Sequence, residues 1–325
     1  MNRQKKLAVG LVSLLILVFV VLVSGLQILE STVLAPEQPA ETPAASKTIT
    51  RKGVDYFPRQ DITVLLILGI DEFGPVKASN SYNNEGEADV VLLAIFDETA
   101  ETYNILALNR DTMMDVPVLG LGGKLAGTYY EQLALSHTYG SGLEDSCENT
   151  RKAVSDFLNG IHIDYYLSMN MDAIGILNDA VGGVKVNVTD DFSLVDPTIQ
   201  MGEMVLQGEQ ALHFVRLRKD VGVQLNIARM ERQRMYMEGF VNALNDQVNQ
   251  NASFVLETYE QVSPYIVSDC SANTLSTLVN RFSEYTLQEI ITPEGENKNG
   301  KMFMEFYVDE KKLDDLVIDL FYREK

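Results

Sequence analysis

Cysteine and histidine are scarce in this 325-residue chain, which has two of the first and three of the second. So few thiol and imidazole groups argue against a structural Cys/His zinc cluster. Basic residues are also in the minority, because 26 Lys and Arg stand against 46 Asp and Glu, for a net charge of −20. Such an acidic chain repels polyanions, which argues against nucleic acid as a partner. The glycine-rich P-loop and the G-x-S-x-G and H-E-x-x-H patterns are missing too.

One long apolar run stands out near the amino terminus, at residues 7–29. A helix rises about 1.5 Å per residue, so this run is long enough for the roughly 30 Å hydrocarbon core of a bilayer. Three basic side chains precede it within residues 1–6, and positive flanks stay in the cytoplasm. The sequence predicts a short cytoplasmic tail at 1–6, an uncleaved transmembrane helix at 7–29 and an extracellular remainder. Residues 30–60 are rich in Pro, Thr and Ala and are predicted to be a linker.

Residues 61–325 carry the strand and helix patterns of a folded domain. No linker interrupts this range, so a single domain is predicted. The β-branched run at 62–70 predicts a buried strand, and the runs at 90–96 and 103–108, separated by a polar turn, predict an antiparallel hairpin. Strands and helices mix without a regular βαβ alternation. This pattern predicts an α/β (α+β) sandwich with a mixed central β-sheet flanked by helices. The other predicted elements are helices at 149–159, 171–181, 226–250, 275–282 and 309–321, and strands at 161–169, 184–188 and 303–308.

Cys147 and Cys270 would lie in the oxidising space outside the membrane. Cysteine pairs there often form disulfides, so a Cys147–Cys270 bridge is predicted. Two unrelated buried thiols are the alternative, because sequence spacing does not show proximity.

Two carboxylates frame the predicted hairpin. If its turn centres near residue 99 or 100, Asp89 at the start of one strand lies opposite Asp111 at the end of the next. Paired strand residues are about 5 Å apart, so a positive charge between the two carboxylates is needed. The candidates are Mg²⁺, held by Asp89 and Asp111, and the neighbouring Arg110. Ordinary acidic strand ends remain the alternative.

A basic island occupies residues 216–234 of this acidic chain. Guanidinium groups bind phosphate oxygens in a bidentate way, which suits arginine to an anion site. Arg229 and Gln233 are four residues apart and share a face of the predicted helix, near its anion-attracting amino end. A solvated, ion-paired helix is the alternative. The basic members are Arg216, Arg218, Lys219, Arg229, Arg232 and Arg234.

Several motifs in a fixed order resemble the LytR-CpsA-Psr (LCP) family of cell-envelope proteins. The matching stretches are LLILGID (65–71), ADVVLLA (88–94), ILALNRDT (105–112), GIHIDYYLSMNMDAIGILNDAVGGVKVNV (160–188), GEQALHFVRLR (208–218) and ARMERQR (228–234). The family motifs lie within 61–240, and 241–325 is a carboxy-terminal extension. The resemblance implies an Mg²⁺-dependent phosphotransferase that moves a glycopolymer, such as teichoic acid or capsule, from a polyprenyl-pyrophosphate carrier to peptidoglycan. It also implies a hydrophobic tunnel for the lipid tail.

The resemblance further implies roles for individual residues. Asp89, Arg110 and Asp111 would be catalytic, with Asp89 and Asp111 on the metal. The pyrophosphate would be bound by Arg110, Arg216, Arg218, Arg229 and Gln233. Glu87 stands where the family often has Arg, and LALSHTYGSG (133–142) departs from the family pattern. An envelope sensor that binds polyprenyl phosphates without turnover, or a lipid-pyrophosphate hydrolase, is the alternative function.

Overall fold

A computed structural model describes most of the chain from residue 48 onward. The described residues are 48–81, 84–120, 123–217, 221, 232, 235–236, 238–240, 242–244, 246–247, 250–251, 254–270, 274, 278, 281–282, 285–301 and 303–324. The predicted tail 1–6 and membrane anchor 7–29 lie outside them. Within the described residues, no helix combines the length and apolar character needed to cross a bilayer.

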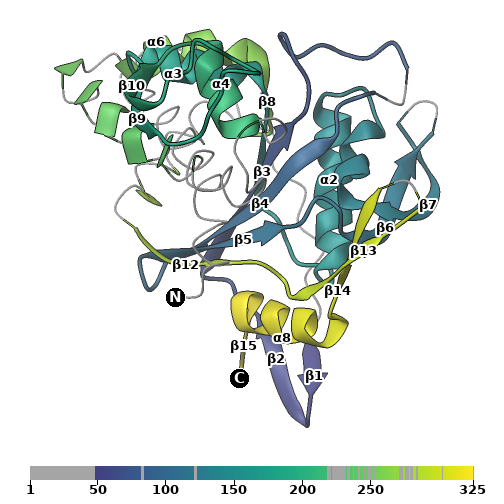
Figure 1. Cartoon of the computed structure of the whole chain (residues 1–325). Helices are drawn as coiled ribbons and strands as arrows, with labels where there is room; N and C mark the ends of the chain where they lie inside the picture. The colour runs from purple at the N-terminus through teal and green to yellow at the C-terminus, as the bar shows by residue number, and fades with distance from the viewer. Residues whose placement is uncertain are drawn as a thin grey trace, which may run out of the picture.

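A six-stranded sheet forms the centre of the domain, in the order β11-β8-β3-β4-β5-β12 (Figure 1). The strands are β3 (Ile62–Ile70), β4 (Ala88–Asp97), β5 (Thr102–Leu108), β8 (Tyr165–Asn170), β11 (Ile266–Ser268) and β12 (Thr286–Ile291). β3 pairs antiparallel with β4 and parallel with β8, while β12 joins β5 in parallel. The prediction of a mixed central sheet is confirmed, and so is the antiparallel β4–β5 hairpin.

Both faces of the sheet are covered, which explains why its central strands are apolar throughout. On β3, Leu65 and Ile67 join one hydrophobic core, and Leu66 and Leu68 join the other. Successive strand side chains point to opposite faces, so a strand buried on both sides needs an unbroken apolar run. The run at 62–70 meets that need.

Different elements cover the two faces (Figure 1). The first face carries α3 (Asp172–Ala180), α4 (Glu209–Arg216), α6 (Phe254–Val262), η3 (Ser263–Tyr265) and the hairpin of β9 (Val184–Val188) with β10 (Gly202–Leu206). The second carries α2 (Glu144–Phe157), η2 (Leu133–Thr138), α8 (Glu310–Phe321), the hairpin of β6 (Met113–Leu119) with β7 (Leu125–Gln132) and the hairpin of β13 (Gly295–Asn299) with β14 (Met304–Val308). The result is the predicted sandwich, in three layers.

The prediction of a linker over 30–60 is wrong for its last part. Residues Ile49–Arg51 form β1 and Val54–Pro58 form β2, and β2 also pairs with β15 (Tyr322–Glu324) near the carboxyl end. Ile49 and Tyr56 pack against the second core, so these residues have hydrophobic partners that only the folded chain supplies.

Other boundaries also moved. The helix predicted at 149–159 begins earlier, as α2, and the strand predicted at 161–169 begins later, as β8. The β6–β7 hairpin was not predicted, because its second strand is exposed along most of its length and has no apolar alternation. Much of the helix predicted at 226–250 lies outside the described residues.

The predicted Cys147–Cys270 disulfide is contradicted, because both residues are free thiols. Cys147 lies on α2 in the second core, whereas Cys270 packs against the first core. The central sheet therefore separates the two sulfur atoms. Burial raises the pKa of both thiols to about 12, so neither is a reactive thiolate.

Candidate functional site

The β4–β5 hairpin brings Asp89 and Arg110 together rather than Asp89 and Asp111. The β4–β5 ladder ends where Val91 pairs with Leu108, and beyond it Nη1 of Arg110 is ion-paired with Asp89 Oδ1. The ladder stops short of residues 89 and 111, so Asp89 and Asp111 are not a strand pair, and both carboxylates contact Arg110 instead.

Arg110 is the centre of a carboxylate cluster at this end of the sheet. Its Nη2 lies 2.7 Å from Glu87 Oε2, its Nη1 is ion-paired with Asp89 Oδ1, and its Nε lies 3.5 Å from Asp111 Oδ1. The guanidinium supplies the positive charge that the carboxylate pair needs. Glu87, which departs from the family pattern, is one of its partners. About a third of the Arg110 side chain is exposed, so the cluster is open to a ligand.

Arg216 reaches the same edge from the other face of the sheet. It is the last residue of α4, and its Nη2 lies 2.7 Å from Asp71 Oδ1, just past the end of β3. The backbone N–H of Asp71 donates to the carbonyl oxygen of Glu87 over 3.0 Å. The two arginines therefore bind carboxylates on adjacent, hydrogen-bonded chain segments. Arg216 also stacks over the exposed ring of Phe73, 5.3 Å from its centroid.

The residues after β7 support the backbone around Arg110. The N–H of Ala134 donates to the carbonyl of Arg110 over 3.0 Å, and that of Leu133 to the carbonyl of Thr112 over 2.8 Å. Both donors belong to η2, within the stretch 133–142 that departs from the family pattern. That stretch holds the turn that carries Arg110 and Asp111 in place.

His137, at the other end of η2, fixes the loop before β4. Its Nδ1 lies 2.8 Å from the carbonyl oxygen of Gly86, while the buried Asn84 amide donates to the His137 carbonyl over 2.9 Å. The imidazole is only 2% exposed. Burial lowers the pKa of His137 to about 4, so the ring is neutral at ordinary pH. His137 is therefore a structural residue.

Arg232 shows that the basic island of residues 216–234 has more than one role. The side chain of Arg232 is 2% exposed and donates to the carbonyl oxygens of Phe214 and Leu217 at the carboxyl end of α4. Its Nη1 pairs with Asp190 at 2.5 Å. Burial lowers its pKa. Arg232 therefore fastens the segment that presents Arg216, and it does not face a ligand.

The other predicted phosphate-binding residues lie outside the described residues. They are Arg218, Arg229 and Gln233, and their roles stay predictions. The described residues bring together Asp89, Arg110, Asp111 and Arg216 at one edge of the sheet. Sequence reasoning missed Asp71 as a partner, although its place directly after a buried strand was the available signal.

The donor set at this edge fits Mg²⁺ only in part. Asp89 and Asp111 offer the hard carboxylate oxygens that Mg²⁺ takes, and Arg110 contacts both. In the described part of the chain, no group of three or more His, Cys, Asp or Glu side chains is placed to hold a metal ion. Mg²⁺ commonly keeps waters and phosphate oxygens as ligands, so a pair of carboxylates is compatible with it.

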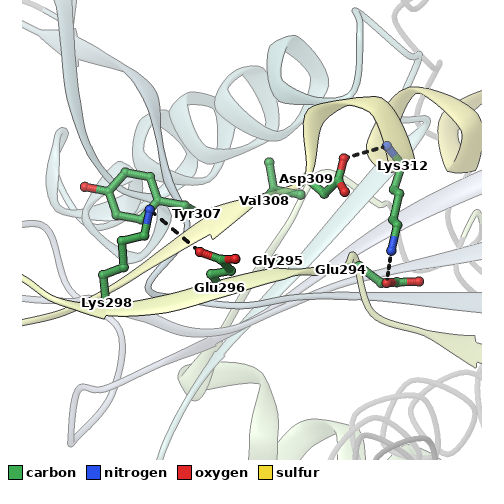
Figure 2. A pocket seen from close by; sticks show the side chains of 8 residues that line it. All are labelled: Glu294, Gly295, Glu296, Lys298, Tyr307, Val308, Asp309 and Lys312. Carbon is green, nitrogen blue, oxygen red and sulfur yellow. Dashed lines mark hydrogen bonds and ion pairs between the residues drawn. The ribbon is translucent and has the colours of Figure 1, made fainter.

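A pocket of about 420 Å³ lies between β13, β14 and the start of α8 (Figure 2). Its two lysines are already ion-paired, Lys298 with Glu296 at 3.9 Å and Lys312 with Glu294. All eight residues that line the pocket lie at 294–312, in the carboxy-terminal extension beyond the family motifs. The Arg110–Arg216 edge is the better candidate.

Together these observations define the class: an α+β sandwich with a guanidinium–carboxylate cluster at one edge of its mixed sheet. The chain belongs to the LytR_cpsA_psr family, whose model matches residues 30–320. The resemblance seen in the sequence motifs is confirmed.

Curated relatives carry transferase names. The polyisoprenyl-teichoic acid–peptidoglycan teichoic acid transferase TagU of Enterococcus faecalis is 28% identical over 242 residues, covering 74% of this chain and 72% of the relative. TagU of Bacillus subtilis is 27% identical over 184 residues, covering 57% of this chain and 53% of the relative. The match thus spans about half the length of the second relative.

Solved structures share the fold. TagT bound to LIIa-WTA superposes with a TM-score of 0.55 at 23% identity, covering 80% of this chain and 90% of that one. At this identity the likeness shows the mixed α+β fold alone.

Proposed function

We propose that this protein is a membrane-anchored extracellular phosphotransferase, which moves a glycopolymer from a polyprenyl-pyrophosphate carrier to peptidoglycan. The observation that carries the proposal is the convergence of Arg110 and Arg216 at one sheet edge, through the hydrogen-bonded segments of Asp71 and Glu87. The names of the relatives, which act on polyisoprenyl-teichoic acid and peptidoglycan, support the substrate class. The expectation of an enzyme agrees with those names.

The arginines would bind the diphosphate. Guanidinium groups pair with phosphate oxygens in a bidentate geometry and keep their charge at any physiological pH. The carboxylates of Asp71 and Glu87 now pair with Arg216 and Arg110, so an arriving diphosphate would replace or share these ion pairs. Arg218, Arg229 and Gln233 would add further contacts from the following segment.

The reaction would be an in-line phosphoryl transfer. The acceptor sugar hydroxyl attacks the phosphorus that carries the glycopolymer, and the bond from that phosphorus to the bridging oxygen breaks. Polyprenyl phosphate leaves, and the glycopolymer phosphate is then esterified to peptidoglycan. Asp89 or Asp111 would accept the hydroxyl proton, because they are the carboxylates held beside Arg110.

Mg²⁺ would be held by Asp89 and Asp111, with phosphate oxygens and water completing its shell. When bound, the ion would neutralise charge on the diphosphate oxygens. Arg110 contacts both carboxylates and would keep them oriented toward the ion. Preoriented charges of this kind stabilise a transition state without the cost of rearranging solvent.

The membrane location is part of the proposal. The apolar run at 7–29 would anchor the chain, with residues 1–6 in the cytoplasm and the catalytic domain outside. An anchor would keep the site near a lipid-linked substrate. A hydrophobic tunnel would receive the lipid tail, as the family resemblance implies.

The test is a transfer assay with the full chain in detergent micelles. The protein is incubated with a labelled lipid-linked disaccharide pyrophosphate, Mg²⁺ and peptidoglycan oligomers, and the products are separated by chromatography. Label attached to peptidoglycan supports the proposal. Free sugar phosphate alone would indicate a hydrolase, and binding without cleavage by folded protein would indicate a sensor. Either outcome contradicts a transferase.

A further inference from the structure

We infer that Gln132 is a positioning residue for Asp111, and that it joins the carboxy-terminal β13–β14 hairpin to the candidate site. The inference rests on the proposed function, and it adds a residue that the family motifs do not include. Gln132 is the last residue of β7, outside every stretch that carries the resemblance.

The Gln132 side chain makes two hydrogen bonds with one nitrogen. Its Nε2 donates to Asp111 Oδ1 over 3.1 Å and to the backbone carbonyl of Met304 over 2.7 Å. The hydrogen bond to Met304 holds the Gln132 amide against β14. The hydrogen bond to Asp111 then fixes the carboxylate relative to that held amide. Asp111 is therefore held by a group that is itself held at a second point.

The backbone of β14 holds the same segment independently. The N–H of Phe306 donates to the carbonyl oxygen of Asp111 over 2.8 Å, and Thr112 forms an isolated parallel bridge with Phe306. Phe306 is 7% exposed, so this contact is well buried. The main chain of Asp111 and its side chain are thus both tied to the carboxy-terminal hairpin.

The contacts on Asp111 select one of its two oxygens. The hydrogen bond from Gln132 and the ion pair with Arg110 both fall on Oδ1. Fixing one oxygen fixes the rotation of the carboxylate, and it leaves Oδ2 to meet Mg²⁺ or the acceptor hydroxyl. Orientation of this kind is what supporting residues supply to reacting groups.

The neutral amide suits this position. A lysine or arginine in place of Gln132 would compete with Mg²⁺ for the Asp111 carboxylate. An aspartate or glutamate there would repel the Asp111 carboxylate. An amide N–H donates one directed bond and adds no charge. The chain already has its positive charge at Arg110, so a neutral donor is what the cluster still needs.

The test compares Gln132→Leu and Gln132→Glu with the wild-type chain and with Gln60→Leu as a matched control. The variant Q132L removes both hydrogen bonds, whereas Q132E keeps the shape and loses the donor. Gln60 is an exposed glutamine just before the amino end of β3, whereas the candidate site lies at the carboxyl end of that strand. Its amide nitrogen lies 3.5 Å from two backbone carbonyl oxygens. We expect kcat to fall roughly 10-fold to 100-fold in both Gln132 variants. The KM for the lipid-linked donor should stay within about twofold, because the arginines that bind it are untouched.

A second measurement separates positioning from simple docking. Hydrogen exchange at the Phe306 amide reports whether β14 stays on the Asp111 segment, and we expect its protection to persist in Q132E. Wild-type kcat in both Gln132 variants would overturn the inference. Loss of Phe306 protection that matches the loss of kcat would also overturn it, because Gln132 would then act only by holding the strand.

The outcome can be told apart from failure of the proposed function. If the wild-type chain transfers no label, the proposed function fails on its own. Crystal structures of wild type and Q132E then decide the inference: an Asp111 carboxylate rotated away from its wild-type orientation supports it, and an unchanged one overturns it.

Discussion

Arg110 and Arg216 are held at the same edge of the central sheet by carboxylates on two hydrogen-bonded chain segments. Arg110 binds Glu87, Arg216 binds Asp71, and the Asp71 N–H donates to the Glu87 carbonyl over 3.0 Å. The two arginines come from a strand end and a helix end that are far apart in the sequence. Their convergence is the geometric basis for the proposed anion site, and it leads to direct tests.

Removing either arginine should reduce turnover while the fold persists. We expect Arg110→Ala and Arg216→Ala each to lower kcat/KM for the lipid-linked donor by about 100-fold, because each removes a charged donor to the diphosphate. Arg281→Ala is the control, since Arg281 pairs with Glu98 at the β4–β5 turn, away from this edge. Steady-state kinetics and circular dichroism provide the measurement. Unchanged kinetics in both site variants would contradict the phosphate site.

Removing Mg²⁺ and removing its proposed carboxylate ligands should both impair transfer. We expect EDTA to abolish transfer and added Mg²⁺ to restore it, because the ion would neutralise charge on the diphosphate. Asp89→Asn and Asp111→Asn should raise the Mg²⁺ concentration that gives half-maximal rate, since each removes an anionic ligand. A rate profile against Mg²⁺ concentration measures this. Full activity in EDTA would show that the metal assignment is wrong.

Stability should fall between neutral and mildly acidic pH because of His137. The pKa of His137 in the folded state is lowered to about 4, below its ordinary value of 6.5. Between these two pH values the unfolded chain binds a proton at His137 and the native chain does not. Stability from the neutral ring is complete above pH 6.5, and it is lost as the pH falls toward 4, where both states are protonated. The full loss is about 3 kcal/mol.

Urea titrations between pH 7 and pH 4 would measure this dependence. His162→Gln serves as the histidine control, since the His162 side chain is 44% exposed. His137→Gln should flatten the slope, even if the variant is less stable at pH 7. An identical slope in the His137 variant would contradict this assignment.

The two cysteines should be free in protein purified without reductant. A thiol reagent should label both Cys147 and Cys270 after unfolding in denaturant, because the sheet keeps their sulfur atoms apart. Dithiothreitol should leave the melting temperature unchanged, since no bridge exists to be reduced. Mass spectrometry of alkylated protein gives the count. A mass that shows no labelled thiol before reduction would reveal the bridge that the structure lacks.

Much of the central sheet could be predicted from the sequence because its strands are buried on both faces. The run at 62–70 coincides with β3, and the polar turn after residue 96 correctly identified the β4–β5 hairpin. The exposed strand β7 carries no such pattern, so it could not be found this way. The strands β1 and β2 were mistaken for linker, because their partners lie near the other end of the chain.

The candidate site was predicted in its residue types and corrected in its pairings. Asp89, Arg110, Asp111 and Arg216 were chosen from the sequence, and they lie at one edge. Asp89 is ion-paired with Arg110, because β5 ends at Leu108 and the residues after it leave the strand ladder. Arg232 belongs to the basic island but was not assigned to the pyrophosphate, and its side chain is buried against α4.

The sequence by itself determined the layered α+β class, the family and the concentration of arginine at 216–234, since these depend on local apolar patterns and on residue types in order. Only the tertiary structure decided which charges meet, that the two thiols lie on opposite faces of the sheet, and that Gln132 ties the carboxy-terminal hairpin to Asp111. Contacts between distant segments follow from register, helix position and packing, and the linear order of residues does not specify them at the resolution of single side chains.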